Sequence, residues 1–227
     1  MREIVLDTET TGLDPAAGHR LVEIGCVELL NHLPTGQTFH RYINPERDMP
    51  EEAFAVHGLS EQFLAGQPVF AEQVADFLEF IGDAPLVIHN AEFDMRFLNW
   101  ELRQLGFQPL PANRAIDTLA IARRRFPGAQ ATLDALCRRF GIDNSSRTKH
   151  GGLLDAELLA EVYLELIGGR EPGLALSGNG PAGTKRQEEN RTAERVFRPA
   201  RPHAPTETEE AAWNQFVDGL KKPLWRE

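Results

Sequence analysis

The sequence predicts an α/β fold in which helices flank a mixed sheet whose first three strands are antiparallel. Three strand-like segments come first, and the connections between them are too short for a helical crossover, which favours antiparallel pairing. From about residue 70 onward the apolar residues follow the helical period instead, with a further strand between two helices. Beyond residue 170 the apolar period stops, which predicts a flexible linker and a short tail.

The strands are indicated by apolar runs that end at turn-forming residues. The first covers residues 3–6, the second 21–30 and the third about 37–43, which Asn44 and Pro45 end. A fourth buried strand is expected over residues 85–89.

The helices are indicated by apolar stripes at helical spacing. They are expected over residues 71–81, 91–105, 118–126, 133–140 and 152–167. Asn90 is expected to cap the second of these helices, and Gly106 to end it.

The charge is unevenly distributed. Residues 1–170 hold 25 acidic and 15 basic residues, a net charge of −10, whereas residues 171–227 hold nine of each. An acidic body argues against tight binding of nucleic acid, or it concentrates carboxylates for metal ions, and composition leaves both open.

The compartment is predicted from what the sequence lacks. No apolar run reaches the roughly 18 residues of a membrane span, and the apolar start of the chain is too short for a signal peptide. Cys26 and Cys137 lie in apolar patterns, which favours buried free thiols in a reducing cytosol. A cytoplasmic location follows as an expectation.

Two carboxylates follow the first apolar run. Asp7 and Glu9 are two residues apart, so on a strand both side chains point to the same face and can bind one cation. Carboxylates at a buried strand end are costly without a cation, which favours a metal site over a solvated strand end.

Two of the expected helices each have an acid in their first turn. Asp94 and Asp155 lie in the first turns of their helices, where the helix dipole favours an acid, yet each lies on the apolar side. His150 stands just before the second helix, next to Gly151 and Gly152, where an accessible imidazole suits a general base, although a loop histidine is often an ordinary surface residue.

These residues lie in three motifs that together resemble those of the DnaQ-like exonucleases with a catalytic histidine. The motifs, in the family's order, are 7–12 (Asp-Thr-Glu-Thr-Thr-Gly), 87–94 (Val-Ile-His-Asn-Ala-Glu-Phe-Asp) and 150–156 (His-Gly-Gly-Leu-Leu-Asp-Ala). A sister group has tyrosine four residues before its last aspartate, where this chain has Gly151. The resemblance implies a ribonuclease-H-like fold and 3′→5′ exonuclease activity.

The resemblance also implies roles for individual residues. It implies that two divalent cations, Mg²⁺ or Mn²⁺, are bound by the four acids Asp7, Glu9, Asp94 and Asp155. His150 would be the general base. Glu52 and His57, in a helix–turn segment, would contact the 3′-terminal nucleotide of DNA together with Asp7, Glu9 and Asp155.

Within that family the chain resembles the proofreading subunits of bacterial DNA polymerase III, the epsilon subunits. This implies an exonuclease domain over 1–170, a flexible linker over 171–206 and a tail over 207–227 that binds the polymerase catalytic (alpha) subunit. Residues 171–176, Glu-Pro-Gly-Leu-Ala-Leu, resemble a degenerate sliding-clamp-binding peptide, although an ordinary linker start explains them equally well.

Two other functions remain open on the sequence alone. An RNA-trimming exonuclease of the same family shares the catalytic set, and only the tail, with Trp213 and Trp225, favours the proofreader. A non-catalytic scaffold that kept the fold is disfavoured because all five catalytic positions are filled.

Overall fold

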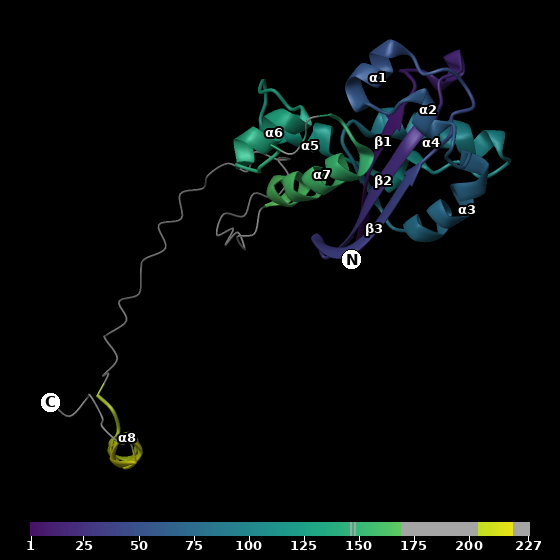
Figure 1. The fold of residues 1–227 in the computed structure, drawn as a ribbon. Helices are drawn as coiled ribbons and strands as arrows, with labels where there is room; N and C mark the ends of the chain where they lie inside the picture. Colours follow the sequence, from purple (N-terminus) through teal and green to yellow (C-terminus); the bar gives the residue numbers. More distant parts are fainter. Residues whose placement is uncertain (146, 148, 169–203, 220–227) are drawn as a thin grey trace, which may run out of the picture. The chain divides into compact units, whose positions relative to one another are not determined.

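A five-stranded mixed sheet, in the order β3-β2-β1-β4-β5, organises the first part of the computed structural model (Figure 1). β1 pairs antiparallel with β2, and β2 with β3, whereas β1–β4 and β4–β5 are parallel, which confirms the predicted antiparallel start. The strands are β1 (Arg2–Thr10), β2 (Leu21–Leu30), β3 (Leu33–Tyr42), β4 (Leu86–Ile88) and β5 (Ala115–Asp117).

The structure describes residues 1–145, 147, 149–168 and 204–219. The chain divides into two units, Met1–Leu176 and Ser177–Glu227, and each is described by itself. Among the helices of the described residues, none combines the length and hydropathy needed to cross a bilayer.

Seven helices accompany the sheet in the described part of the first unit. They are α1 (Glu51–His57), α2 (Glu61–Leu64), α3 (Phe70–Ile81), α4 (Ala91–Gln104), α5 (Thr118–Arg125), α6 (Leu133–Phe140) and α7 (Gly152–Ile167), with two 3-10 turns at Pro15–Ala17 and Ala112–Arg114. The five helices expected from apolar spacing are all present, each within one residue of its expected bounds.

The side chains of the central strand alternate between two cores. Ile4 and Leu6 pack on one side with Phe77 of α3 and Phe97 of α4, whereas Val5 packs on the other side with residues of α5, α6 and α7. The same alternation continues past the apolar run. It turns Asp7 and Glu9 toward the α7 side, and Thr8 between them toward the α4 side.

Three sequence-based expectations need correction. β1 runs on to Thr10 because its pairing with β2 continues beyond the apolar run, so Asp7 and Glu9 lie within the strand. β3 starts earlier, at Leu33, because Asn31 and His32 both have positive φ and close a two-residue hairpin. Asn90 precedes α4, but its side chain forms no capping hydrogen bond.

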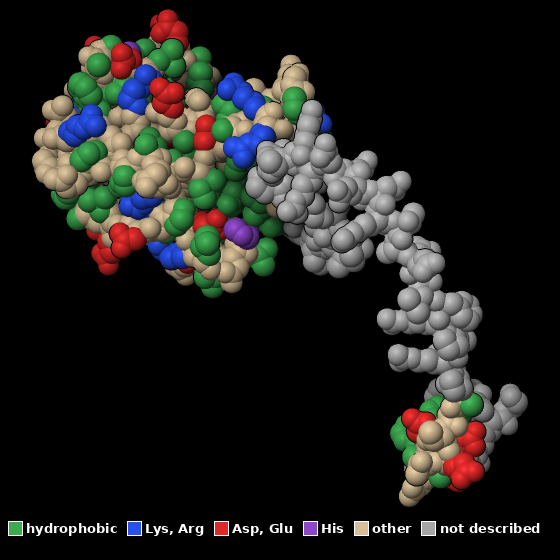
Figure 2. Space-filling model, turned by 180° about the vertical axis from the view of Figure 1, so that it is seen from behind, with side chains coloured by type: hydrophobic (Ala, Val, Ile, Leu, Met, Phe, Trp, Pro, Cys, Tyr) green, Lys and Arg blue, Asp and Glu red, His purple; other side chains and the backbone are tan. Residues whose placement is uncertain are grey.

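The second unit contains one described helix, α8 (Glu207–Asp218). Thr206 and Glu209 form a reciprocal capping box at its start. Trp213 and Phe216 are 52% and 59% exposed on it, and Figure 2 shows acidic and apolar side chains on this helix. Most of the expected linker, including the clamp-like residues 171–176, and the end of the tail lie outside the described residues.

Candidate active site

The strand part of the site is Asp7 and Glu9 on β1. Asp7 is half-buried and Glu9 is 9% exposed, and they stand opposite Gly25 and Glu23 of β2. Both carboxylates point toward α7, because residues two apart on a strand share a face. Both acids therefore lie where α7 begins.

A close approach of two glycines brings that helix to the strand. A Cβ on Gly25 would lie only 2.1 Å from the Gly152 carbonyl carbon, a distance that real side chains do not tolerate. The first turn of α7 therefore packs directly on the backbone of β2, next to Asp7. This packing explains why residue 152 is a glycine, and it places Asp155 at the same site.

Asp94 is held from the opposite side of β1. The backbone N–H of Thr8 donates to Asp94 Oδ1 over 3.0 Å, and the Thr8 hydroxyl donates to the same oxygen over 2.7 Å. Asp94 is 3% exposed, which confirms its expected inward position on α4. The residue between the two strand acids thus anchors the third acid.

Asp155 is engaged by Arg147, a residue that the sequence analysis did not select. Arg147 Nε and Nη2 donate to the two carboxylate oxygens of Asp155 over 2.5 and 2.7 Å, and Nη1 donates to Asp134 Oδ1 over 2.8 Å. The Arg147 side chain is only 8% exposed. A buried guanidinium therefore occupies both oxygens of an expected metal ligand.

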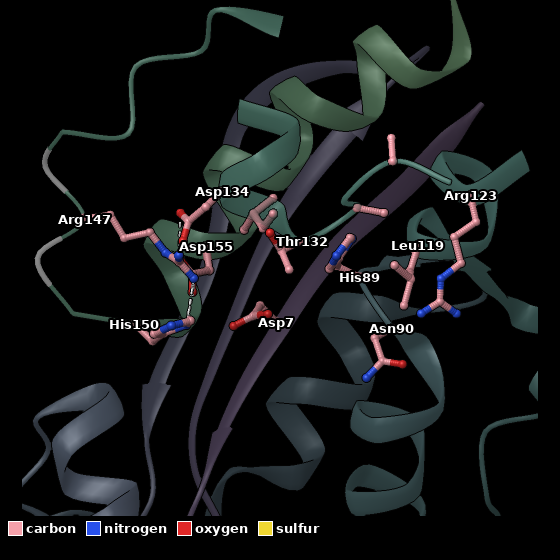
Figure 3. Close-up of a pocket in the computed structure, with 13 residues that line it drawn as sticks. Asp7, His89, Asn90, Leu119, Arg123, Thr132, Asp134, Arg147, His150 and Asp155 are labelled. Carbon is pink, nitrogen blue, oxygen red and sulfur yellow. Dashed lines mark hydrogen bonds and ion pairs between the residues drawn. The ribbon is translucent and has the colours of Figure 1, made fainter. Parts of the chain in front are cut away.

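His150 lies next to the same pair. Its Nδ1 is 2.7 Å from Arg147 Nη2 and 3.2 Å from Asp155 Oδ2 (Figure 3). Because a guanidinium only donates, Nδ1 accepts in the first contact. Arg147 thus covers one ring nitrogen of the expected general base as well as the carboxylate of Asp155.

The loop that carries His150 is docked on α1. The His150 N–H donates to the Val56 carbonyl over 3.2 Å, and Lys149 Nζ donates to the Ala55 carbonyl over 2.6 Å. α1 also carries Glu52 and His57. These two hydrogen bonds therefore join the loop of the expected general base to the helix that is expected to contact the nucleotide.

Three of the four acids, Asp7, Glu9 and Asp94, have raised pKa values. Burial, and then repulsion from Asp155, Glu23 and Asp94, raises the pKa of Glu9 to about 8. Burial also raises the pKa of Asp94 to about 7, against the hydrogen bonds from Thr8. The pKa of Asp7 lies well above its ordinary value through burial and the nearby Asp94, Glu9 and Asp155.

Asp155 shows the opposite behaviour. Burial acts to raise its pKa, but the neighbouring His150 together with the hydrogen bonds and the charge of Arg147 outweighs burial and lowers it. The cluster thus contains three acids whose charge is poorly compensated and one that is compensated by Arg147.

Two hollows adjoin the cluster. The polar pocket, of about 720 Å³, is lined by Asp7, Asp155, His150 and Arg147, and extends to His89, Asn90, Leu119 and Arg123. The apolar pocket, of about 540 Å³, is lined by Glu9, Glu52, His57, Thr8 and Phe93 among others. The structure therefore places Asp7 and Glu9 where the two hollows approach each other.

The donor set fits a hard divalent cation. Donor atoms of Glu9, His150 and Asp155 all lie within 4.8 Å of one another, and carboxylate oxygens are the ligands that Mg²⁺ and Mn²⁺ prefer. Asp7 and Asp94 are close enough to raise each other's electrostatic cost, although Asp94 Oδ1 is engaged by Thr8. Cations at this point would favour the charged forms of these acids, against the burial and the repulsion that raise the pKa values of Asp7 and Glu9.

All seven site residues expected from the sequence lie at the cluster or in the apolar pocket. Arg147 and Asp134 were not expected from the sequence, and the structure adds them to the site. Asp134 stands at the start of an apolar helix, where an acid has an ordinary dipole explanation. Arg147 lies in a stretch without periodicity, and only its position three residues before His150 could have drawn attention to it.

Comparison with known sequences gives a consistent result. A family model described as Exonuclease matches residues 4–163. A DNA polymerase III subunit epsilon of Rickettsia felis is 58% identical over 174 residues, which is 75% of this chain and 76% of that protein. The DNA polymerase III subunit epsilon of Salmonella typhimurium is 45% identical over 240 residues, covering 99% of this chain and 97% of that protein.

Solved structures support the fold. The nuclease domain of 3′hExo, described as a DEDDh family member bound to rAMP, superposes with a TM-score of 0.63 at 21% identity, over 73% of this chain and 91% of that one. Exonuclease X in complex with 5′ overhanging duplex DNA gives a TM-score of 0.56 at 24% identity, over 72% and 90%. These likenesses confirm the ribonuclease-H-like fold expected from the motifs.

Proposed function

We propose a proofreading function on the premise that this chain belongs to the exonuclease family of the bacterial DNA polymerase III epsilon subunits. The chain is a 3′→5′ exonuclease by that membership. The proposal adds that it removes mispaired 3′-terminal nucleotides from DNA within the replicating polymerase, in the cytoplasm. The observation that carries it is the convergence of Asp7, Glu9, Asp94, His150 and Asp155 at one end of the sheet.

The four acids are the proposed ligands of two divalent cations, Mg²⁺ or Mn²⁺. The raised pKa values of Asp7, Glu9 and Asp94 support this assignment, because a cation would offset the cost of placing charge on these buried neighbouring acids. When bound, such ions polarise the scissile phosphodiester and ease deprotonation of water. Arg147, which donates to both oxygens of Asp155, would compete with the ions for this carboxylate.

The protein's own residues then perform the remaining steps. His150 takes a proton from the attacking water once Arg147 has left its ring nitrogen. The water oxygen forms a bond to phosphorus, the bond to the 3′ oxygen of the preceding nucleotide breaks, and that oxygen takes up a proton. The product is a nucleoside 5′-monophosphate.

The apolar pocket is the proposed site of the terminal nucleoside. Phe93 gives it an apolar wall, whereas Glu52 and His57 offer polar groups for the sugar. Burial lowers the pKa of His57, which favours its neutral form. Selection of mispaired ends needs no base reading, because an unpaired terminus costs less to separate from its template.

Weak intrinsic binding of DNA is part of the proposal. Figure 2 shows acidic and basic side chains interspersed on the visible face of the first unit, without a continuous basic surface. The net charge of −10 over residues 1–170 points the same way. We therefore expect the polymerase to deliver the substrate.

The proposal is tested by digestion of a 5′-labelled DNA primer with a mispaired 3′ end, beside an RNA strand of the same sequence. The expected result is stepwise shortening of DNA, faster at the mispaired end, that requires Mg²⁺ or Mn²⁺ and disappears in Asp7→Ala. Preferential digestion of the RNA would favour the RNA-trimming alternative. Equal rates for the wild-type chain and Asp7→Ala would remove the enzymatic proposal altogether.

The tail is the proposed contact with the polymerase catalytic (alpha) subunit. Trp213 and Phe216 are largely exposed on α8, and such aromatic side chains serve as anchors in protein interfaces. The similarity to the Salmonella typhimurium protein covers 99% of this chain, so it includes the tail. Truncation after Ala200 should abolish co-purification with the polymerase while nuclease activity persists, and retained co-purification would contradict the assignment.

Residues 171–176 are a weaker candidate for contact with the sliding clamp. The proposal rests on sequence resemblance, since these residues lie outside the described ones. Replacement of Leu174 and Leu176 by alanine should weaken clamp binding, and unchanged binding would remove this contact.

A further inference from the structure

Arg123 lies at an end of the polar pocket that the proposed hydrolysis does not use. It projects from α5, is exposed, and lines the same hollow as Asp7 and Asp155. Within the described residues, the structure shows no hydrogen bond or ion pair made by its guanidinium. Arg147, the other cation of this pocket, is instead held by Asp134 and Asp155.

Asn90 lies beside Arg123 in an unusual backbone conformation. Its φ is 64°, which is uncommon outside glycine and often occurs at functional sites. The backbone N–H of Asn90 donates to Asp117 Oδ1 over 3.1 Å, and the same oxygen accepts from the Leu119 N–H over 2.9 Å at the start of α5. Asp117 thus fixes Asn90 to α5, and the amide lines the pocket instead of capping α4.

The two ends of the pocket have different chemistry. Figure 3 shows Arg123, Leu119 and Asn90 at one end and Arg147, His150 and Asp155 at the other, with Asp7 and His89 between them. Leu119 and Arg123 are four residues apart on α5, so they share one helix face. The Arg123 end therefore offers a guanidinium, an amide and an apolar side chain, without an acid among its three residues.

The position of this end relative to the acids indicates what it would bind. If the terminal nucleoside occupies the apolar pocket beside Glu9, the scissile phosphate lies at the acids and the rest of the strand must leave in another direction. The polar pocket extends from Asp7 to Arg123 and is, at about 720 Å³, the larger of the two hollows. The strand on the 5′ side of the scissile bond would then pass Arg123.

We propose that Arg123 binds the phosphodiester group of the strand on the 5′ side of the scissile bond, with Asn90 donating a second hydrogen bond. A guanidinium matches two phosphate oxygens at once. Leu119 covers the neighbouring sugar. The inference rests on the proposed nuclease function and adds the path of the substrate to it.

The test compares two substrates of the full-length chain with Mn²⁺. One is a single-stranded DNA oligonucleotide. The other is the 4-nitrophenyl ester of thymidine 5′-monophosphate, which has a scissile phosphodiester but no nucleotide on its 5′ side. Arg123→Ala should lower kcat/KM for the oligonucleotide about tenfold, as expected for one charge-assisted contact, and leave hydrolysis of the ester unchanged.

Arg124→Ala is the matched control, because Arg124 is also exposed on α5 but does not line the pocket. It should leave both substrates unaffected. The dependence of log kcat/KM on log salt for the oligonucleotide should also become shallower by about 0.7 in Arg123→Ala, the value for one phosphate contact on a single strand.

Equal loss on both substrates, no loss on either, or the same loss in Arg124→Ala would each overturn the role of Arg123. Failure of the proposed function looks different, since the wild-type chain itself would then release no nucleotide from the oligonucleotide.

Discussion

Asp7 and Asp155 line the same pocket, yet their carboxylates are stabilised in different ways. Asp7, on β1, is surrounded by Glu9, Asp94 and Asp155, and its pKa is raised. Asp155, on α7, accepts two hydrogen bonds from Arg147, and its pKa is lowered. The strand side of the cluster thus lacks a cation, whereas the helix side has one supplied by the protein. A divalent cation would therefore compensate the acids on β1 and would compete with Arg147 for Asp155.

The largest expected effect is on kcat, which substitution of Asp7 on β1 and of Asp155 on α7 should lower to a similar extent. Asp7→Asn and Asp155→Asn should each lower kcat on a DNA primer by on the order of a thousandfold, because each removes a proposed metal ligand. Primer digestion at saturating Mg²⁺ measures this. Substantial activity in either variant would show that the two sides do not form one site.

Removal of the proposed base should have the next largest effect. His150→Gln keeps a polar side chain but cannot accept the proton from water, so kcat should fall by about a hundredfold or more. Single-turnover primer digestion measures the change, and an unchanged melting temperature shows that the fold is intact. A loss below about threefold, well under the usual contribution of a general base, would assign the proton to another group.

In stability measurements without metal, the two sides should respond in opposite directions. Asp155→Asn should destabilise the fold by about 3 kcal/mol, because it leaves the buried Arg147 without its main counter-charge. Asp7→Asn should raise stability, because it removes a half-buried acid that Asp94, Glu9 and Asp155 repel. Urea unfolding in EDTA compares them, and destabilisation of equal size in both variants would contradict the distinction.

The pH dependence of stability should reveal the uncompensated side. The pKa of Glu9 is about 8 in the folded chain, above its ordinary value of 4.5, so the folded state binds more protons between these two pH values. The contribution of Glu9 to the free energy of unfolding is therefore fully present below pH 4.5 and is lost as pH rises through 8. The melting temperature in EDTA should fall over this range, and Mn²⁺ should reduce the fall. A melting temperature that rises with pH would oppose this interpretation.

The smallest effect concerns the competition between Arg147 and the metal. Arg147→Gln should bind Mn²⁺ several-fold more tightly than the wild-type chain, because both oxygens of Asp155 become available. Arg138→Gln, a change of the same kind on α6 outside the pocket, is the control. Weaker Mn²⁺ binding in Arg147→Gln would mean that Arg147 supports the metal site instead of competing with it.

The sequence allowed much of this architecture to be predicted because it rests on periodic patterns. The spacing of Asp7 and Glu9 gave their common face, and the apolar stripe next to Asp155 gave its inward position. β5 and α2 were missed, because segments of three and four residues carry too little periodicity. Arg147 was missed because it lies outside any periodic pattern and its contacts with Asp134 and Asp155 depend on loop geometry. Asn90 was misjudged because its backbone N–H is held by Asp117, which is far away in the sequence.

The most direct measurement is a calorimetric titration of metal-free protein with Mn²⁺, without substrate, for the wild-type chain and for Asp7→Asn. We expect the wild type to bind two ions per chain and Asp7→Asn to lose binding or bind much more weakly, because the acids on β1 need a cation that the protein does not supply. Binding of the same number of ions with the same affinity by both proteins would contradict this expectation.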